Sequence, residues 1–505
     1  MIALLVADGG HPARLRTLCR KLDTEIPSEA CFEILYGRSE TAFWLDSSSH
    51  TDGQGRYSFM GDASGPLSET ISYNVETGLV RTHSVAGTSI SRDTIFDFIN
   101  RRIEAIGFVD QCPAPVPFKG GYVGYLGYEL KADCGGRRTH VSGQPDAQFV
   151  FADRIVAFDH QTRTAWMICV IEPGTEQVAE AWFSAVESAL KNNYLVAKPK
   201  FSALNESDPN NPPRWQPRQS EADLVRAVDR VRDTAGREVL REVTLSSSWS
   251  ATYDGPALGI YQKLRGSQSV PFGAFLRFSD LKVLSFSPER MAIITRDGKV
   301  RSEPARGSVP RGASPAHDED LKSRLQNNQQ SRARNLNVAE LVASDLRKVC
   351  RMGTIRAETL CVVESLSANH HMVSRISGKL RGDETAVTGV RALFPAGSVV
   401  GAPKQPALDI IDEIESGPRG ILSGSVGYFS LDGAADLNVC GRTIVIDGDQ
   451  ASTASADSIV ALSSPAAEIK DLMRKDEGLR TALLSEAPLE FETVNIDAPI
   501  QASAE

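Results

Sequence analysis

Arginine side chains gather in two neighbouring parts of this sequence. RSEPARGSVPRGA, Arg301–Ala313, is followed by SRARNLNVAELVASDLRKVC, Ser331–Cys350, which has helical spacing. A guanidinium stays protonated, is a very poor nucleophile, and presents a planar fork that pairs with carboxylates. The two stretches leave two alternatives open, a working active site or the altered remains of one. The competing interpretation is a set of solvated arginines on a helix surface.

Histidine and cysteine offer little further chemistry. The one histidine cluster is NHH, Asn369–His371, and two adjacent histidines form a polar turn more often than a metal site. The eight cysteines stand singly, with no CxxC and no close Cys/His spacing. This pattern argues against a zinc site or a disulfide framework, and we expect most of the cysteines to be small core residues.

Composition limits the possible functions. The chain has 505 residues, of which 41% are hydrophobic and 24% charged, so it is long enough for two to three domains. Its net charge of -9 disfavours a protein that grips nucleic acid phosphates. The sequence has no apolar run of about 18 residues, and its start, MIALLVADGGHPARL, lacks a basic region. We therefore expect a cytoplasmic protein with no nucleic-acid partner, membrane span or secretory signal.

The first 170 residues read mainly as strands. Runs such as TAFWLDSS (41–48) and AQFVFADRIVAFD (147–159) are rich in β-branched and aromatic residues. Apolar residues recur at helical spacing in 94–106 and in 176–192. A β-rich N-terminal subdomain, 1–196, is the expected result.

A stretch rich in Pro, Asn and Ser, 197–223, reads as a linker to a second subdomain, 224–484. The tail, 485–505, is expected to be flexible.

The second subdomain alternates long helices with strand pairs. GAFLRF (273–278) and KVLSFS (282–287) predict an antiparallel pair, and Asp-Gly in MAIITRDGKVRSEP (291–304) predicts a hairpin. A long helical pattern, 318–350, is expected to break near Asn327 and Asn328. Large antiparallel sheets with helices outside would follow, which is an α+β architecture.

Several longer motifs are spread along the chain. They are AFWLDSS, SFMGDASGPLSE, GGYVGYLGYELKADCGG, SFSPER, GSVPRGA, LFPAGSVVGAPK, IIDEIESGPRGILSGSVGYFSLDGAADLNV and GRT. With these motifs the chain resembles the chorismate-utilising enzymes, which include anthranilate synthase component I and the isochorismate and salicylate synthases, and within them the branch of aminodeoxychorismate synthase component I. The resemblance covers most of Phe32–Leu479 in the family's order.

The resemblance implies an anthranilate synthase component I-like fold, with two large interleaved antiparallel sheets flanked by helices. It also implies one deep pocket that binds chorismate through Mg²⁺. Members of the branch add ammonia, delivered by a glutaminase partner, and displace the 4-hydroxyl of the ring. No glutaminase motif is visible in this sequence, so amination would need a separate glutaminase subunit or free ammonia.

The resemblance also assigns roles to single residues. Glu289 in SFSPE matches an acid near the ring, and His370 matches a histidine near the departing group, where an imidazole suits proton donation. Arg442 in GRT matches an arginine that pairs with a substrate carboxylate, and Lys475 a basic residue near the same end.

The GAPK turn retains Gly401 and Ala402, whose expected role is to shape the backbone beside the ligand. For Glu289 there is also a structural alternative to a role in catalysis, because Pro-Glu at 288–289 is simply a good helix start.

One departure from the family affects catalysis directly. Relatives carry the motif PIKGT, whose lysine is a proposed nucleophile, whereas this chain reads PARGS with Arg306 in that position. Because a guanidinium is a very poor nucleophile, covalent catalysis of that kind should fail here.

A second departure affects the metal. The family holds Mg²⁺ with acidic side chains on two helices, but this chain has Ser331 and Arg334 on the first and retains Glu468 and Asp471 on the second. Mg²⁺ requires oxygen ligands, and a fixed positive charge opposes its binding. We predict no Mg²⁺ and no other cofactor. Arg334 is expected to pair with Glu468 or Asp471, or to contact a substrate carboxylate.

Other expected pocket positions also differ from the family. The glycine-rich loop of relatives reads SADS, and single changes occur at three further positions. These positions are Ser455–Ser458, Leu240, Leu422 and Gly441.

Three functions are therefore open. The favoured one is an aminodeoxychorismate-synthase-like enzyme with a remodelled, Mg²⁺-independent pocket, acting in a biosynthetic pathway on a small carboxylated molecule, either chorismate or a different anion. The second is a conventional component I that aminates chorismate at C4. The third is a non-catalytic binding or regulatory homologue.

Overall fold

Strands from the whole length of the chain form two large sheets. The computed structural model describes residues 14–483, except 24–25, 50–53, 194–212, 238–239, 461–462 and 475–476. The predicted tail and most of the predicted linker lie outside the described residues. All pairings between the strands are antiparallel except that of β1 with β7.

Among the described residues, the first sheet has 13 strands. Its order is β12 (Gln216–Pro217), β13 (Glu242–Thr252), β25 (Gln450–Ile459), β24 (Thr443–Asp447), β15 (Leu281–Ser287), β14 (Phe272–Phe278), β2 (Thr41–Asp46), β3 (Tyr57–Asp62), β10 (Arg154–Asp159), β11 (Thr164–Ile171), β1 (Arg14–Leu22) and β7 (Gly107–Val109), and β21 (Gly401–Ala402) pairs with β13.

The second sheet has 12 strands in the part of the chain that the structure describes. Its order is β18 (Ala305–Pro310), β20 (Asn369–Lys379), β17 (Lys299–Glu303), β16 (Arg290–Ile294), β23 (Ala435–Val439), β22 (Ser425–Ser430), β8 (Gly121–Leu126), β9 (Ala147–Ala152), β4 (Glu69–Asn74), β5 (Leu79–Ser84) and β6 (Gly87–Arg92), and β19 (Arg356–Ser365) pairs with β20.

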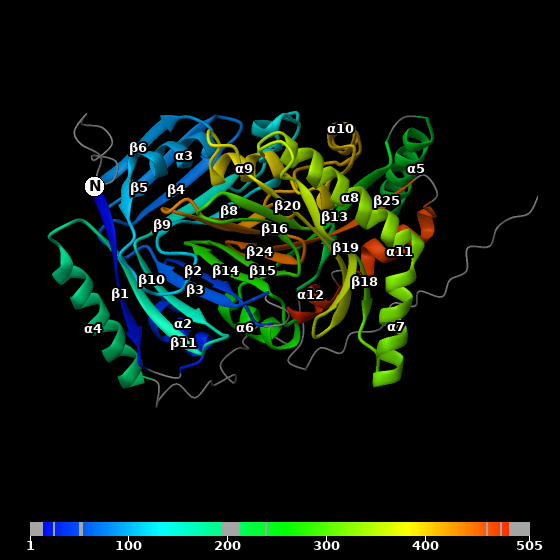
Figure 1. Cartoon of the computed structure of the whole chain (residues 1–505). Coiled ribbons are helices and arrows are strands. Elements are labelled where there is room, and N and C mark those ends of the chain that lie inside the picture. The colour runs from blue at the N-terminus through cyan, green and yellow to red at the C-terminus, as the bar shows by residue number, and fades with distance from the viewer. Residues whose placement is uncertain are drawn as a thin grey trace, which may run out of the picture.

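Helices cover the outer faces of the sheets (Figure 1). Short 3₁₀ turns lie at Tyr128–Cys134 and Gly397–Val399. The helices are α2 (Ser28–Tyr36), α3 (Ile95–Ala105), α4 (Glu176–Asn193), α5 (Glu221–Arg237), α6 (Ala257–Ser267), α7 (Pro315–Asn327), α8 (Gln329–Arg347), α9 (Ala386–Leu393), α10 (Lys404–Ile414), α11 (Pro465–Arg474) and α12 (Glu477–Ala482).

The strand sequences explain this layering. In β2, Phe43 faces a core that lies between the two sheets, whereas Trp44 packs on the opposite side with Phe32 of α2 and Tyr261 of α6. Successive side chains of a strand point to opposite faces, so an uninterrupted apolar run is buried on both. The α+β architecture with two interleaved, helix-flanked sheets is thereby confirmed.

Both sheets run through the two halves of the chain without a break. In the 13-stranded sheet Trp44 of β2 pairs with Phe275 of β14, and in the 12-stranded sheet Tyr122 of β8 pairs with Phe429 of β22. Residues before and after the predicted linker, 197–223, therefore contribute strands to the same two sheets.

Several local predictions agree with the structure. Strands β14 and β15 pair, β16 and β17 form a hairpin at Asp297-Gly298, and the long helix breaks at Asn328, whose side chain caps α8. The polar turn expected at Asn369–His371 is wrong, because these residues begin strand β20.

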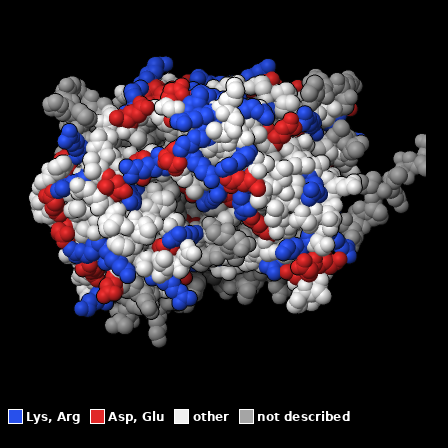
Figure 2. Space-filling model, in the orientation of Figure 1, with Lys and Arg blue, Asp and Glu red and all other residues white. Residues whose placement is uncertain are grey.

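The surface agrees with the charge argument. On the face shown in Figure 2, basic and acidic side chains are interspersed, with no extended basic patch. Among the described helices, none combines the length and the apolar character that crossing a bilayer requires.

Candidate functional site

Two crossings between the sheets bring Glu289 and Arg442 close together. Glu289 lies where the chain passes from β15 in the 13-stranded sheet to β16 in the 12-stranded sheet, and Arg442 lies where it returns from β23 to β24. Backbone hydrogen bonds tie the crossings, since Phe286 N donates to Arg442 O at 2.8 Å and Val439 N to Glu289 O at 3.1 Å. The backbone segments that carry the predicted acid and the predicted arginine therefore lie side by side.

The surroundings of Glu289 favour its protonated form. Burial raises the pKa of its carboxyl group to about 7, and the Ser398 hydroxyl, the Arg306 guanidinium and the Ala305 amide only partly oppose this rise. An acid with a pKa near neutrality is suited to giving and taking a proton at physiological pH.

Glu289→Gln should change how stability depends on pH. Between the pKa of 4.5 in the unfolded chain and about 7 in the folded chain, the native state holds a proton that the unfolded state has lost. The native carboxyl therefore costs stability as the pH rises through this window. We expect the variant to match the wild type below pH 4.5 and to gain on the order of 2–3 kcal/mol in free energy of unfolding above pH 7.

Urea unfolding between pH 4 and pH 8 measures this difference. Glu104→Gln, at an exposed position of α3, serves as the matched control and should leave the profile unchanged. Parallel profiles for Glu289→Gln and the wild type would contradict the assignment.

Arg442 lies in protein surroundings without a compensating charge among the described residues. Burial lowers the pKa of its guanidinium, and among the described residues no ion pair joins Arg442 to a carboxylate. Its charge also acts on His371, whose pKa falls to about 3, first through burial and then through the nearby Arg442 and His370 side chains. A guanidinium in this state is suited to receiving an anion.

The two histidines of NHH have different neighbours in the structure. His370, at the position matched to the family, contacts Asp318 Oδ1 through Nε2 at 3.0 Å and Ser365 Oγ through Nδ1 at 2.8 Å. It is fully buried beside α7. His371, which the resemblance did not match to the family histidine, is the one near Arg442. The predicted role of His370 stays a prediction, and His371 becomes a second candidate.

Arg306 is held by polar groups of neighbouring elements. Its Nη2 donates to Thr244 Oγ1 at 2.6 Å and to the carbonyl of Ser398, and lies 3.8 Å from Glu242 Oε1. Glu242 is fully buried and accepts a hydrogen bond from Ser458 Oγ at 2.5 Å. Arg306, at the position of the family lysine, is therefore held by polar groups close to Glu289.

Arg334 pairs with one of the two acids retained on α11. Its Nη2 lies 3.2 Å from Glu468 Oε1, which also accepts a hydrogen bond from Ser463 Oγ at 2.7 Å. Ser331 faces Gly307, where an added Cβ would meet the Ser331 Cβ at 3.0 Å.

Two of the side chains at the position that the resemblance gives to Mg²⁺, Arg334 and Glu468, are ion-paired with each other. Glu468 is a carboxylate that the ion would need. Within the described residues, no three His, Cys, Asp or Glu side chains group as a metal site.

The other predicted positions are distributed around this group. Gly401 has a φ of +124° and its added Cβ would meet Glu242 O at 2.1 Å, so the turn requires glycine beside β13. Ala402 pairs with Glu242 in the same ladder. Lys475 lies outside the described residues. Ser455–Ser458 belongs to β25, where Ser455 Oγ bonds to Leu472 O.

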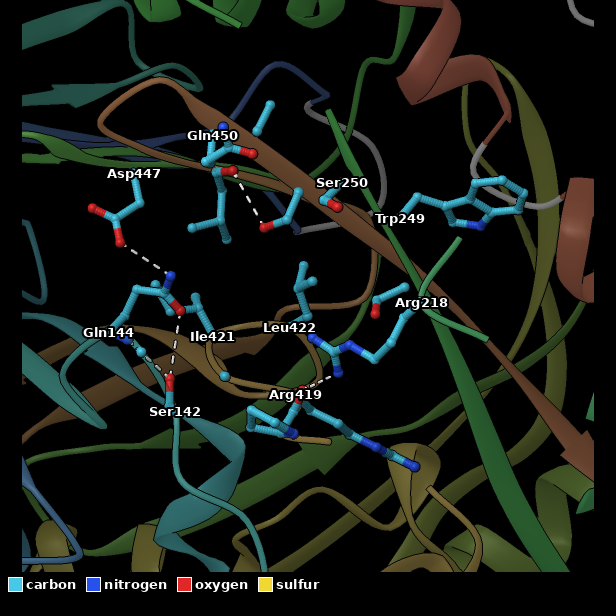
Figure 3. A pocket seen from close by; sticks show the side chains of 17 residues that line it. Ser142, Gln144, Arg218, Trp249, Ser250, Arg419, Ile421, Leu422, Asp447 and Gln450 are labelled. Atoms are coloured by element: carbon cyan, nitrogen blue, oxygen red, sulfur yellow. Dashed lines mark hydrogen bonds between the residues drawn. The ribbon is translucent and has the colours of Figure 1, made fainter. Parts of the chain in front are cut away.

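A separate cavity of about 390 Å³ adjoins the site (Figure 3). Leu422, at the position of a family tyrosine, lines it, whereas Glu289, Arg306 and Arg442 do not. Arg419 lines the cavity and donates hydrogen bonds to Thr244 O and Val399 O, so it stands between the hollow and the surroundings of Arg306.

Sequence reasoning missed three residues that hold Arg306. Leu240, singled out as a changed pocket position, packs in the hydrophobic core, while Glu242 two residues later faces the guanidinium. The available signal was an acid at the first position of the strand-like run EVTLSSSW, because a buried carboxylate requires a partner. Thr244 and Ser398 carried no comparable signal.

Comparison with known proteins now adds to the geometry. The family described as chorismate binding enzyme matches residues 49–480. The aminodeoxychorismate synthase of Streptomyces griseus is 36% identical over 466 residues, which cover 92% of this chain and 64% of that protein. The aminodeoxychorismate synthase component 1 of Salmonella typhimurium is 28% identical over 396 residues, 77% of this chain and 82% of that protein.

The fold is shared with a solved relative. Anthranilate synthase component I from Streptococcus pneumoniae superposes with a TM-score of 0.71 at 23% identity, covering 91% of this chain and 99% of that one. The chain spans less than two thirds of the Streptomyces griseus protein, so that protein's full activity is not carried over. The family match extends over most of the sequence, and the chain therefore belongs to the chorismate binding enzymes.

Proposed function

We propose that this chain is an aminodeoxychorismate-synthase-like enzyme that acts on chorismate, or on a similar small carboxylated anion, without Mg²⁺. The ion pair between Arg334 and Glu468 is the observation that carries this proposal. The resemblance puts a metal-binding acid at Arg334, and a fixed guanidinium there supplies the positive charge that the ion would otherwise provide.

The side chains have complementary roles in the proposed reaction. Arg442 binds a substrate carboxylate through its fork, because no described acid already neutralises it. Glu289 holds a proton near neutral pH and is placed to pass it to a leaving hydroxyl, which departs as water. His371 stays neutral and offers one ring N–H as a hydrogen-bond donor.

Arg306 does not serve as a nucleophile in this scheme. Its charge is fixed by Thr244 and Glu242, and it stabilises negative charge on the substrate or on Glu289 after proton transfer. Ammonia for an amination would come from the solution or from a separate glutaminase subunit. The name component 1 of the Salmonella typhimurium relative supports a partner of that kind.

A metal-dependence assay tests the proposal. Purified protein is incubated with chorismate and ammonium, with Mg²⁺ or with EDTA, and chorismate is followed by chromatography. We expect consumption to be the same in both conditions. Consumption that EDTA abolishes would establish the conventional, Mg²⁺-dependent reaction instead. If chorismate is not consumed, and calorimetry shows that it is not bound, the result would favour a different anion or a non-catalytic role.

A charge-reversal variant tests the ion pair itself. The double change Arg334→Glu and Ser331→Asp should place like charges beside Glu468, which lowers the thermal midpoint in EDTA. Mg²⁺ should restore part of that midpoint in the variant and leave the wild type unchanged. Arg332→Glu, on the same helix but without Glu468 as a partner, is the matched control. Tight, stoichiometric Mg²⁺ binding by the wild type would refute the proposal.

A further inference from the structure

Two cysteines that are distant in the sequence lie against each other at the edge of the inter-sheet core. Cys19 belongs to β1 and Cys112 follows β7. Thr17, which lies on the same face of β1 as Cys19, donates to Asp110 Oδ1 at 3.0 Å and accepts from Gln111 N at 3.1 Å. The segment after β7 is thereby fixed alongside β1, and Cys112 is brought to Cys19.

The contacts of the two thiols show this proximity. Their side chains hydrogen-bond to each other, and both sulfurs also reach the backbone of Ala114. Cys112 is buried within the inter-sheet core, whereas Cys19 packs against that core and stays partly exposed. One thiol of the pair is thus accessible to a small oxidant and the other is protected behind it.

A cation stands beside the pair. Lys119 Nζ donates to Cys112 O at 2.9 Å and to Asp110 Oδ2 at 2.6 Å. The pKa of Cys19 is lowered, because the Cys112 thiol donates to its thiolate and Lys119 adds positive charge. By contrast, burial raises the pKa values of Cys169 and Cys440 to about 12.

We propose that Cys19 and Cys112 are an oxidation site that closes reversibly into an intramolecular disulfide. The Cys19 thiolate attacks one oxygen of hydrogen peroxide, so an S–O bond forms, the O–O bond breaks and hydroxide leaves as water after taking a proton. Cys112, giving up its proton, then attacks the Cys19 sulfur, which forms the S–S bond and releases the second oxygen as water. Two thiols and one peroxide give one disulfide and two waters.

The bond would join β1 covalently to the segment that leads into β8. A link between residues so far apart in the chain restricts the unfolded state more than the folded one. The oxidised protein should therefore unfold at a higher temperature than the reduced protein, and dithiothreitol should reverse the change.

Peptide mass spectrometry of the full-length chain tests the proposal. Protein treated with a small excess of hydrogen peroxide is alkylated and digested. We expect one cross-linked peptide pair, Cys19 with Cys112, lighter by two hydrogens and formed before any other cysteine is modified. Cross-links or acids that appear first at another cysteine, or Cys19 oxidised to sulfinic acid with Cys112 still free, would overturn it.

Single variants separate the two roles. Cys112→Ser should leave Cys19 as a sulfenic acid that dimedone traps, and Cys19→Ser should leave Cys112 unmodified. Cys134→Ser, at another partly exposed cysteine whose pKa burial raises to about 12, is the matched control and should keep the cross-link. If a variant does not fold, the wild-type peptide map still decides. Equal midpoints for oxidised and reduced wild type would contradict the stabilisation.

Discussion

Arg442→Met should weaken the binding of a carboxylated substrate by roughly 100-fold or more and, at the same time, make the fold more stable. The weaker binding reflects the loss of a charge-assisted, bidentate contact, which costs about 3 kcal/mol. The gain in stability has a different cause. In the free protein the guanidinium is partly buried, which lowers its pKa, and among the described side chains no carboxylate pairs with it. Removing an uncompensated charge should raise the free energy of unfolding by about 1 kcal/mol.

The opposite signs make this prediction specific to a binding role. Chorismate titration by calorimetry gives the affinity, and urea unfolding gives the stability. Arg442→Lys keeps the charge but loses the fork, so its affinity should fall to an intermediate value. A variant that loses stability and keeps its affinity would show that Arg442 supports the crossing between the sheets instead.

Arg419→Met should destabilise the protein by about 3–5 kcal/mol. Arg419 is 6% exposed and binds Glu415 through two hydrogen bonds of 2.8 and 2.6 Å. It also donates to Val399 O at 2.6 Å and to Thr244 O at 2.8 Å, and stacks over Tyr128 at 4.4 Å. Its removal leaves a buried carboxylate without its cation.

Urea unfolding measures the loss, with Arg226→Met as the control. Arg226 has a side chain that is 72% exposed and pairs with Asp223 on the surface, so its variant should change stability by less than about 0.5 kcal/mol. Arg419→Met combined with Glu415→Met should recover part of the loss, because the unpaired carboxylate is gone. A double variant less stable than Arg419→Met alone would contradict this account.

Local signals in the sequence predicted the elements that are determined by residues close together along the chain. Asp297-Gly298 suits a tight hairpin turn, and the side chain of Asn328 accepts from Ser331 N, so the helix break is encoded by the cap itself. The alternation of the sheets between the two halves came from the family resemblance, because pairing between remote strands leaves no local pattern.

The crossing at Arg442 shows where local reasoning fails. DLNVCGRTIVIDG reads as one strand, yet the chain leaves one sheet after Val439 and enters the other at Thr443. Gly441 is a weak local signal, because glycine is depleted in strands, but it indicates an irregularity and not a change of sheet, which tertiary packing decides.

The choice between the two histidines had a usable signal. Successive strand residues face opposite sides, so His370 shares a face with Met372 and Ile376, which are buried apolar residues. That face packs under the helices, whereas His371 shares the other face with Arg375, which is ion-paired with Glu364. The polar face was therefore the better guide to the site.

The pairing of Trp44 with Phe275 and of Tyr122 with Phe429 has a consequence for synthesis. On the ribosome, β2 and β8 emerge long before the strands that complete their ladders, so each presents open hydrogen-bonding groups and apolar faces to its surroundings. A nascent chain of this design depends on shielding by a chaperone, or on delayed collapse, until its later strands arrive.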